Sequence, residues 1–155
     1  MSELKDRLRA DLTASMKARD ALTTGTLRMA LTAVTNEEVS GATARDLSDA
    51  EVITVLTREV KKRKEAAEAY DGANRPELAE KERAESEVLG RYLPQQLTDE
   101  ELTALVGEAV AEVQSSLGSA PTMKQMGQVI KAAQARSAGR ADGARVAAAV
   151  RAELS

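Results

Sequence analysis

Apolar residues recur at helical spacing from the first turn of the chain. Four of them lie one helical turn apart near the N-terminus: Leu4, Leu8, Leu12 and Met16. This spacing predicts a helix over residues 2–20, with a narrow apolar stripe that needs a partner helix. A second helix is predicted after Gly25. It should end near Gly41, where glycine would take the left-handed C-terminal position.

Capping signals mark the next two helices. Ser48 and Glu51 have the spacing of a capping box, which predicts that a third helix starts there. Pro76 suits the first turn of a fourth helix. Pro94 ends that helix, because the residue before a proline avoids helical geometry. Residues 93–96 are therefore predicted to be a linker.

Three shorter helices are predicted beyond this linker. Thr98 and Glu101 form a second capping box at the start of the fifth helix. The Ser115–Pro121 segment separates it from a sixth helix that stops near Gly139, and Asp142 can cap a seventh. The sequence thus predicts an all-α fold in two parts: an N-terminal bundle of about four helices over residues 1–93 and a compact three-helix C-terminal domain over residues 94–155.

Composition favours the same fold class. Although 43% of the residues are hydrophobic, the only aromatic side chains are those of Tyr70 and Tyr92. The β-branched and aromatic runs that favour strands are missing, so both cores must be aliphatic. No stretch approaches the roughly 20 apolar residues of a membrane helix, and the N-terminus has no signal-peptide pattern. We therefore expect a cytoplasmic protein with no membrane partner.

The sequence contains no cysteine and no histidine. That composition excludes disulfides, thiol nucleophiles, zinc sites built on Cys or His, and catalytic triads with histidine. The glycines form neither a GxGxxG loop nor a P-loop, and adjacent acids such as Glu37 and Glu38 splay about 100° apart on a helix. We therefore predict no catalytic residue, no metal ligand and no cofactor.

Charge is distributed unevenly in the C-terminal part. Residues 93–118 hold five acids and no base. Residues 119–151 hold one acid, Asp142, and six bases: Lys124, Lys131, Arg136, Arg140, Arg145 and Arg151. Six bases and one acid give this segment a net charge of +5. Such a polarised module can attract phosphates, and a solvated helix face is the simpler interpretation.

Six residues of this basic segment are the candidate nucleic-acid contacts: Lys124, Gly127, Gln128, Lys131, Arg136 and Arg140. Lys124 and Lys131 lie seven positions apart, hence on one side of the sixth helix, with Gln128 between them. Gly127 is explained either by close helix packing or by the close approach of a ligand backbone. Arg140 would place its guanidinium beside the free amides of the seventh helix, where phosphate is favoured.

A second basic run, Arg58–Lys64, lies on the third helix. Its bases wrap around that helix, and Glu65, Glu68 and the acids of the fourth helix are near in sequence. Charge pairing within the bundle is the favoured interpretation. Nucleic-acid binding, with the salt dependence of counterion release, is the alternative.

Five segments resemble the GatB/YqeY family, whose members are related to the C-terminal region of the B subunit of tRNA-dependent amidotransferases: Leu27–Met29, Lys61–Tyr70, Tyr92–Leu97, Met126–Val129 and Gly139–Gly143. The resemblance covers the whole chain. It implies a helical domain followed by a three-helix tail domain that, in the amidotransferase, helps to grip tRNA. It also implies the label of a carbon–nitrogen ligase with glutamine as amide donor, although the kinase-like domain that performs this chemistry is not among these residues.

Three functions follow as hypotheses. The leading one is an accessory protein that binds tRNA or another structured RNA and has no catalytic site of its own. The alternative from another class is a helical adapter for a translation- or amidation-related protein, which it would contact through the stripe of the first helix and the charged third helix. The third is amidotransferase activity of the chain itself, with glutamine as amido-N-donor.

Overall fold

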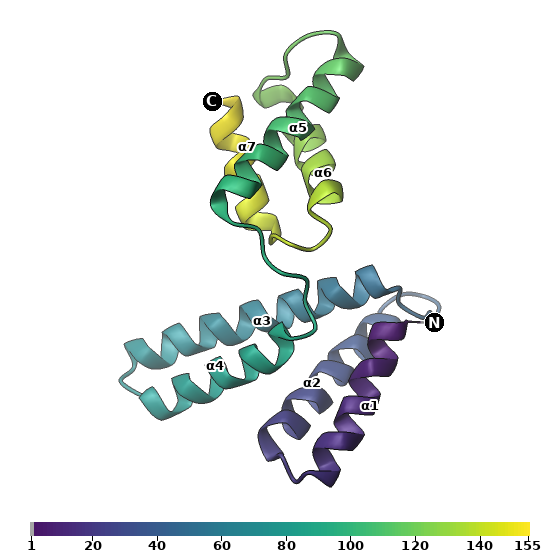
Figure 1. Ribbon diagram of the computed structural model, residues 1–155, viewed down its shortest axis with the longest axis vertical. Helices are drawn as coiled ribbons and strands as arrows, with labels where there is room; N and C mark the ends of the chain where they lie inside the picture. Colours follow the sequence, from purple (N-terminus) through teal and green to yellow (C-terminus); the bar gives the residue numbers. More distant parts are fainter. Residues whose placement is uncertain (1) are drawn as a thin grey trace. The chain divides into compact units, whose positions relative to one another are not determined.

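The computed structural model describes residues 2–155 and divides into two compact units, Met1–Leu93 and Pro94–Ser155 (Figure 1). No β-strand occurs in the described residues, so the predicted all-α class is confirmed. A 3-10 turn, η1 (Met123–Gln125), leads into the sixth α-helix. The seven α-helices are α1 (Glu3–Lys17), α2 (Ala21–Glu38), α3 (Asp49–Gly72), α4 (Pro76–Gly90), α5 (Asp99–Leu117), α6 (Met126–Ser137) and α7 (Gly143–Leu154).

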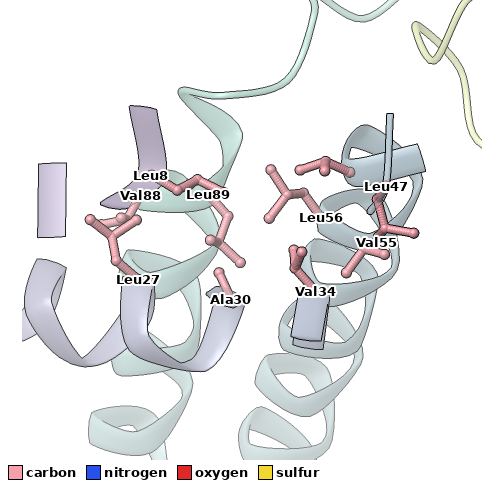
Figure 2. Packing of buried hydrophobic residues seen from close by; sticks show 10 residues of the cluster. Leu8, Leu27, Ala30, Val34, Leu47, Val55, Leu56, Val88 and Leu89 are labelled. Atoms are coloured by element: carbon pink, nitrogen blue, oxygen red, sulfur yellow. The ribbon is translucent and has the colours of Figure 1, made fainter. Parts of the chain in front are cut away.

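The first unit packs α1 to α4 around one aliphatic core (Figure 2). Its most extensive helix contacts are between α3 and α4 and between α1 and α2. Burial of each large aliphatic side chain contributes about 1.5–3 kcal/mol, which offsets the cost of ordering the helices. The core residues are Leu8, Leu27, Ala30, Val34, Leu47, Val52, Val55, Leu56, Val88 and Leu89.

The turn between α1 and α2 lies at residues 18–20, whereas the sequence predicts it near Gly25. Asp20 is the reason, because its carboxylate accepts a hydrogen bond from the Thr23 amide at 3.1 Å and caps α2. Arg19 makes the tight turn possible by adopting a left-handed φ of 57°. Gly25 is therefore tolerated inside α2, and the prediction that α1 extends to Asp20 is wrong by three residues.

Two further helix-end predictions need correction. Helix α2 ends at Glu38, and Gly41 is not left-handed. Ser48 does cap α3 by accepting from the Glu51 amide at 3.3 Å. The Glu51 carboxylate, however, pairs with Arg45 and does not return to the Ser48 backbone, so this capping box is only half formed.

The end of α4 is held to α1 by Tyr92. Its hydroxyl donates to the Asp11 carboxylate at 2.6 Å, and the Arg7 guanidinium lies 4.7 Å from the ring centroid. Burial, followed by the hydrogen bond to Asp11, raises the pKa of the Tyr92 phenol to about 12. The hydroxyl therefore remains a hydrogen-bond donor at every physiological pH.

A buried ion pair joins α3 to α4. The Arg63 Nε atom lies 3.2 Å from Glu85 Oε2, and the two residues are only 6% and 7% exposed. Arg63 also donates to the Glu59 carbonyl at 3.0 Å, and its Nη2 lies 3.7 Å from Met29 Sδ on α2. Each nitrogen of the guanidinium therefore has at least one acceptor within the unit.

Most of the basic run on α3 is used inside the unit. Besides the pair made by Arg63, Arg58 pairs with Glu37 and Lys62 pairs with Glu59, both at 3.1 Å. The favoured interpretation of this run, charge pairing within the bundle, is confirmed for these three bases. The acids involved are only partly those suggested by proximity in sequence, because Glu37 comes from α2.

The second unit packs α5, α6 and α7 around a separate aliphatic core. Both predicted caps at its helix starts are confirmed. Thr98 and Glu101 form the full capping box of α5, and the Asp142 carboxylate accepts from the Arg145 amide at 2.8 Å to start α7. The core residues are Leu97, Leu102, Val106, Ala109, Val113, Val129, Ala133, Val146 and Val150.

Replacing Arg63 by leucine should lower the free energy of unfolding by about 3–5 kcal/mol, because the Glu85 carboxylate is left buried without its cation. Replacing both Arg63 and Glu85 by leucine should recover most of this loss. Urea unfolding followed by circular dichroism measures both effects. Arg83→Leu is the matched control, since its pair with Asp71 is exposed. Equal losses for Arg63→Leu and Arg83→Leu would contradict the prediction.

Candidate functional site

Four of the six candidate contacts lie together on the exposed side of η1 and α6. Lys124, Gly127, Gln128 and Lys131 are all exposed, while Val129 turns into the core. Within residues 2–155, neither lysine has a carboxylate within 4.0 Å of its ammonium group. The seven-residue separation corresponds to about 10 Å along a helix. This surface, the α6 face, therefore presents two unpaired positive charges.

Gly127 lies in open space on the α6 face. A Cβ atom built on it would meet no atom within 4 Å, so no neighbouring helix requires a glycine there. The explanation of Gly127 by close helix packing is therefore wrong. The missing side chain leaves the helix backbone accessible between Lys124 and Lys131.

Arg136 points away from that face and toward α5. Its Nη1 lies 3.2 Å from Glu108 Oε2, and its Nε lies 3.2 Å from Glu112 Oε2. The acidic helix and the basic helix predicted from the sequence are thus neighbours whose charges are partly matched. Arg136 has two intramolecular partners and contributes less net charge to the surface than the two lysines.

Arg140 and Arg145 hold the chain segment that precedes α5. Arg140 Nε donates to the Gln95 carbonyl at 2.9 Å, and the Arg140 carbonyl accepts from the Leu97 amide at 2.8 Å. Arg145 Nη2 donates to the Leu97 carbonyl and to Asp99 Oδ1, both at 3.0 Å. We call these contacts the arginine clasp. They join the start of α5 to the loop before α7.

The clasp changes the expected role of Arg140. The first-turn amide of Arg145 is already taken by the Asp142 carboxylate, and a negative group there repels phosphate. Arg140 itself faces the Gln95 carbonyl and, at 3.7 Å, Glu101. Arg140 thus makes a structural contact through its Nε, and its contact with phosphate stays a prediction.

From the sequence, Arg145 is one of the six bases of residues 119–151, and no specific contact was predicted for it. A signal was present, because Arg145 lies in the first turn of α7, where a cation opposes the helix dipole. A cation in such a place needs a compensating partner. The partner, the Leu97 carbonyl, lies 48 residues away in the sequence and could not be identified from it.

Chemistry beyond charge is sparse in this part of the protein. Within residues 2–155, no group of three acidic residues is placed to hold a metal ion. The helices of the same residues include none with the length and apolar character needed to cross a bilayer. The α6 face therefore consists of two ammonium groups, one amide side chain and the accessible helix backbone at Gly127.

Replacing Arg145 by methionine should loosen the arginine clasp while keeping most of the apolar stem. We expect amide hydrogen exchange at Leu97 to accelerate by about tenfold, because loss of one net hydrogen bond costs roughly 1–1.5 kcal/mol. Nuclear magnetic resonance measures this exchange directly. Lys131→Met, which removes an unpaired cation, should leave the Leu97 amide unchanged. Equal exchange rates in wild type and Arg145→Met would show that the clasp does not hold the segment.

Comparison with known proteins gives one family and several fungal relatives. A family model described as Yqey-like protein matches residues 5–154. An uncharacterized protein of Schizosaccharomyces pombe is 34% identical over 88 residues, which is 57% of this chain and 70% of that protein. The protein named "Altered inheritance of mitochondria protein 41, mitochondrial" is 30% identical over 111 residues in Lachancea thermotolerans, covering 70% of this chain and 59% of that protein.

A second protein of that name, from Meyerozyma guilliermondii, is 27% identical over 125 residues. The alignment covers 79% of this chain and 64% of that protein. The chain thus spans less than two thirds of the length of these two relatives.

Proposed function

The chain belongs to the family of YqeY-like proteins, and on that premise we propose that its C-terminal unit binds structured RNA, with tRNA as the expected partner. The family is related to the C-terminal domain of the amidotransferase B subunit. We propose that Pro94–Ser155 corresponds to the tail domain of that subunit. The observation that carries the proposal is the α6 face, where Lys124 and Lys131 have no carboxylate partner among the described residues.

The side chains of the α6 face suit a phosphate backbone better than bases. Lysine ammonium groups pair with phosphates as point charges, and such contacts position an RNA without specifying its sequence. Gly127 lets a ribose–phosphate chain approach the helix, and Gln128 adds a donor beside it. The chain has no Phe, Trp or His for base stacking, so recognition would rest on RNA shape.

In this proposal Arg136 and Arg140, which were also predicted to contact phosphate, mainly hold the helices together, unlike the two lysines. Arg136 ties α6 to α5, and Arg140 ties the loop after α6 to the segment before α5. They hold the α6 face in place, and their remaining charge adds to the attraction of an anion. Lys124 and Lys131 make the direct contacts.

The Lys124→Ala/Lys131→Ala variant should bind tRNA about tenfold more weakly than wild type. A plot of the logarithm of the association constant against the logarithm of the salt concentration has a negative slope. The magnitude of this slope should decrease by about 1.5–2 in the variant, because two phosphate contacts are lost. Fluorescence anisotropy with labelled tRNA at several salt concentrations measures both quantities. Lys61→Ala/Lys64→Ala removes two exposed lysines of α3 that have no carboxylate within 4.0 Å among residues 2–155, and it serves as the matched control. Equal, salt-insensitive binding by wild type and the first variant would defeat the proposal.

We further propose that the chain alone is not a carbon–nitrogen ligase, and that such a label would describe kinship. Its 155 residues offer no thiol or imidazole for catalysis. Incubation of the purified chain with glutamine, ATP and mischarged tRNA should give no amidated product above a reaction without protein. Product formed in proportion to the chain would establish the activity and overturn this proposal.

The adapter role is a second candidate, and one observation favours it. Among the described residues of the first unit, Met16, Leu22 and Met29 are 39–47% exposed. Most of the α1 stripe first suggested for a partner is covered, because Leu8 is fully buried and Leu4 packs against the same core, and only its Met16 end is exposed. A partner would therefore meet the Met16 end of this stripe together with the exposed apolar residues of α2.

A further inference from the structure

We propose that the connected ends of α1 and α2 bind an acidic amphipathic segment of a partner protein. The surface, called the hairpin-tip patch, consists of Met16, Lys17, Arg19, Leu22, Arg28 and Met29. The inference rests on the adapter role and gives it a location and a partner chemistry. It is separate from RNA binding, because every residue of the patch belongs to the first unit.

The apolar part of the patch is built on α2. Leu22 and Met29 lie seven residues apart, hence on one side of the helix, and are 39% and 43% exposed. Gly25 lies between them, and a Cβ atom on it would meet nothing within 4 Å. Two apolar side chains therefore flank an open stretch of helix backbone, which a partner helix can approach closely.

Met16 extends the apolar surface onto α1. It is 47% exposed, and its Sδ lies 3.6 Å from Nη2 of Arg28 on α2. This contact places the exposed Met16 of α1 beside the basic Arg28 of α2. Methionine side chains adapt to differently shaped apolar partners, which suits a surface for docking.

The cations of the patch lack carboxylate partners. Lys17, Arg19 and Arg28 have none within 4.0 Å among the described residues. Asp20 is the only acid between residues 12 and 36, and both of its oxygens accept hydrogen bonds from Thr23. The bonds to the Thr23 side chain and backbone hold the pKa of Asp20 below its usual value. Asp20 therefore remains an anion, and with the three cations Lys17, Arg19 and Arg28 it leaves the surroundings of the patch with a net charge of +2.

Arg19 adds an independent argument. Its φ of 57° is left-handed, a conformation that glycine adopts without steric cost and that asparagine tolerates better than arginine. The turn between α1 and α2 therefore does not explain an arginine at this position. In this proposal, Arg19 contributes the third cation of the patch at the tip of the hairpin.

The combination of side chains favours a protein partner over RNA or a membrane. RNA would use the three cations but not the three exposed apolar side chains, and the patch has no aromatic residue for stacking. Helices that lie in membrane interfaces commonly insert Trp or Phe, and neither occurs here. An acidic helix with one apolar face complements both the charge and the apolar residues.

The test is a titration of the full 15N-labelled chain with a synthetic amphipathic peptide that carries leucines on one helical face and glutamates elsewhere. Backbone amide shifts should concentrate at residues 14–32 and weaken as salt concentration rises. A peptide with lysine in place of every glutamate should cause no shifts there. Shifts located elsewhere, or their absence with the acidic peptide, would overturn the proposal.

Two sets of variants separate the patch from general charge effects. Lys17→Glu/Arg28→Glu should weaken binding of the acidic peptide by about tenfold or more, whereas Lys61→Glu/Lys64→Glu, with the same charge change on α3, should not. Arg19→Gly should raise the melting temperature by relieving the left-handed arginine and yet weaken binding several-fold. Equal losses in both charge-reversed variants, or unchanged binding by Arg19→Gly, would contradict a role for the patch.

Two further probes distinguish the other occupants. Neither tRNA nor vesicles of phosphatidylserine and phosphatidylcholine should shift residues 14–32, and a shift caused by either without one from the peptide would assign the patch to that ligand. The Lys124→Ala/Lys131→Ala variant should bind the peptide normally, so the RNA proposal and this one can fail separately. A nuclease-resistant protein partner retained by Lys17→Glu/Arg28→Glu would leave an adapter role standing without this surface.

Discussion

The guanidinium groups of Arg140 and Arg145 lie against the carbonyl oxygens of Gln95 and Leu97, at 2.9 and 3.0 Å. These carbonyls precede α5, so no helix satisfies them, and for the partly buried Leu97 oxygen an unpaired state is costly. By supplying the donors, the two arginines bind the start of α5 to the loop before α7. The short three-helix unit depends on this closure, because Leu97 is part of its core.

Charge pairing also determines which cations remain for function. Arg136 and Arg145 are matched by acids of α5, and Arg63 is matched within the first unit by Glu85. The bases left without carboxylates are therefore informative where they gather on an exposed surface. Two such surfaces carry the proposals: the α6 face and the hairpin-tip patch. They differ in chemistry, because the first combines its cations with a glycine and an amide, and the second with exposed apolar side chains.

The segments that resemble the GatB/YqeY family have mainly structural contacts in this protein. Tyr92 binds Asp11, Arg63 lies in the buried ion pair, and Arg140 belongs to the arginine clasp. A shared sequence pattern therefore supports kinship and fold more directly than it supports a binding site. Two segments are exceptions: Gly127 and Gln128 of Met126–Val129 lie on the exposed α6 face, and Arg28 and Met29 of Leu27–Met29 belong to the hairpin-tip patch.

Features that depend on neighbours three or four residues apart were accessible from the sequence alone. The all-α class, the caps at Thr98 and Asp142, and Pro76 in the first turn of α4 are of this kind. The predicted position of the α1–α2 turn was wrong, because glycine is the residue that most often ends a helix and Gly25 was the nearest one. The steric preference of non-glycine residues for negative φ does not predict a turn at Arg19, whose φ is positive.

In the candidate site, too, some features follow from the local sequence and others depend on the tertiary structure. Periodicity alone placed Lys124, Gln128 and Lys131 on one side of a helix. Which cations are neutralised depended on partners brought together by folding, such as Glu112, 24 residues from Arg136, and Leu97, 48 residues from Arg145. Helical spacing acts within one turn of the chain, whereas ion pairing and exposure depend on which helices meet, and only the tertiary structure decides that.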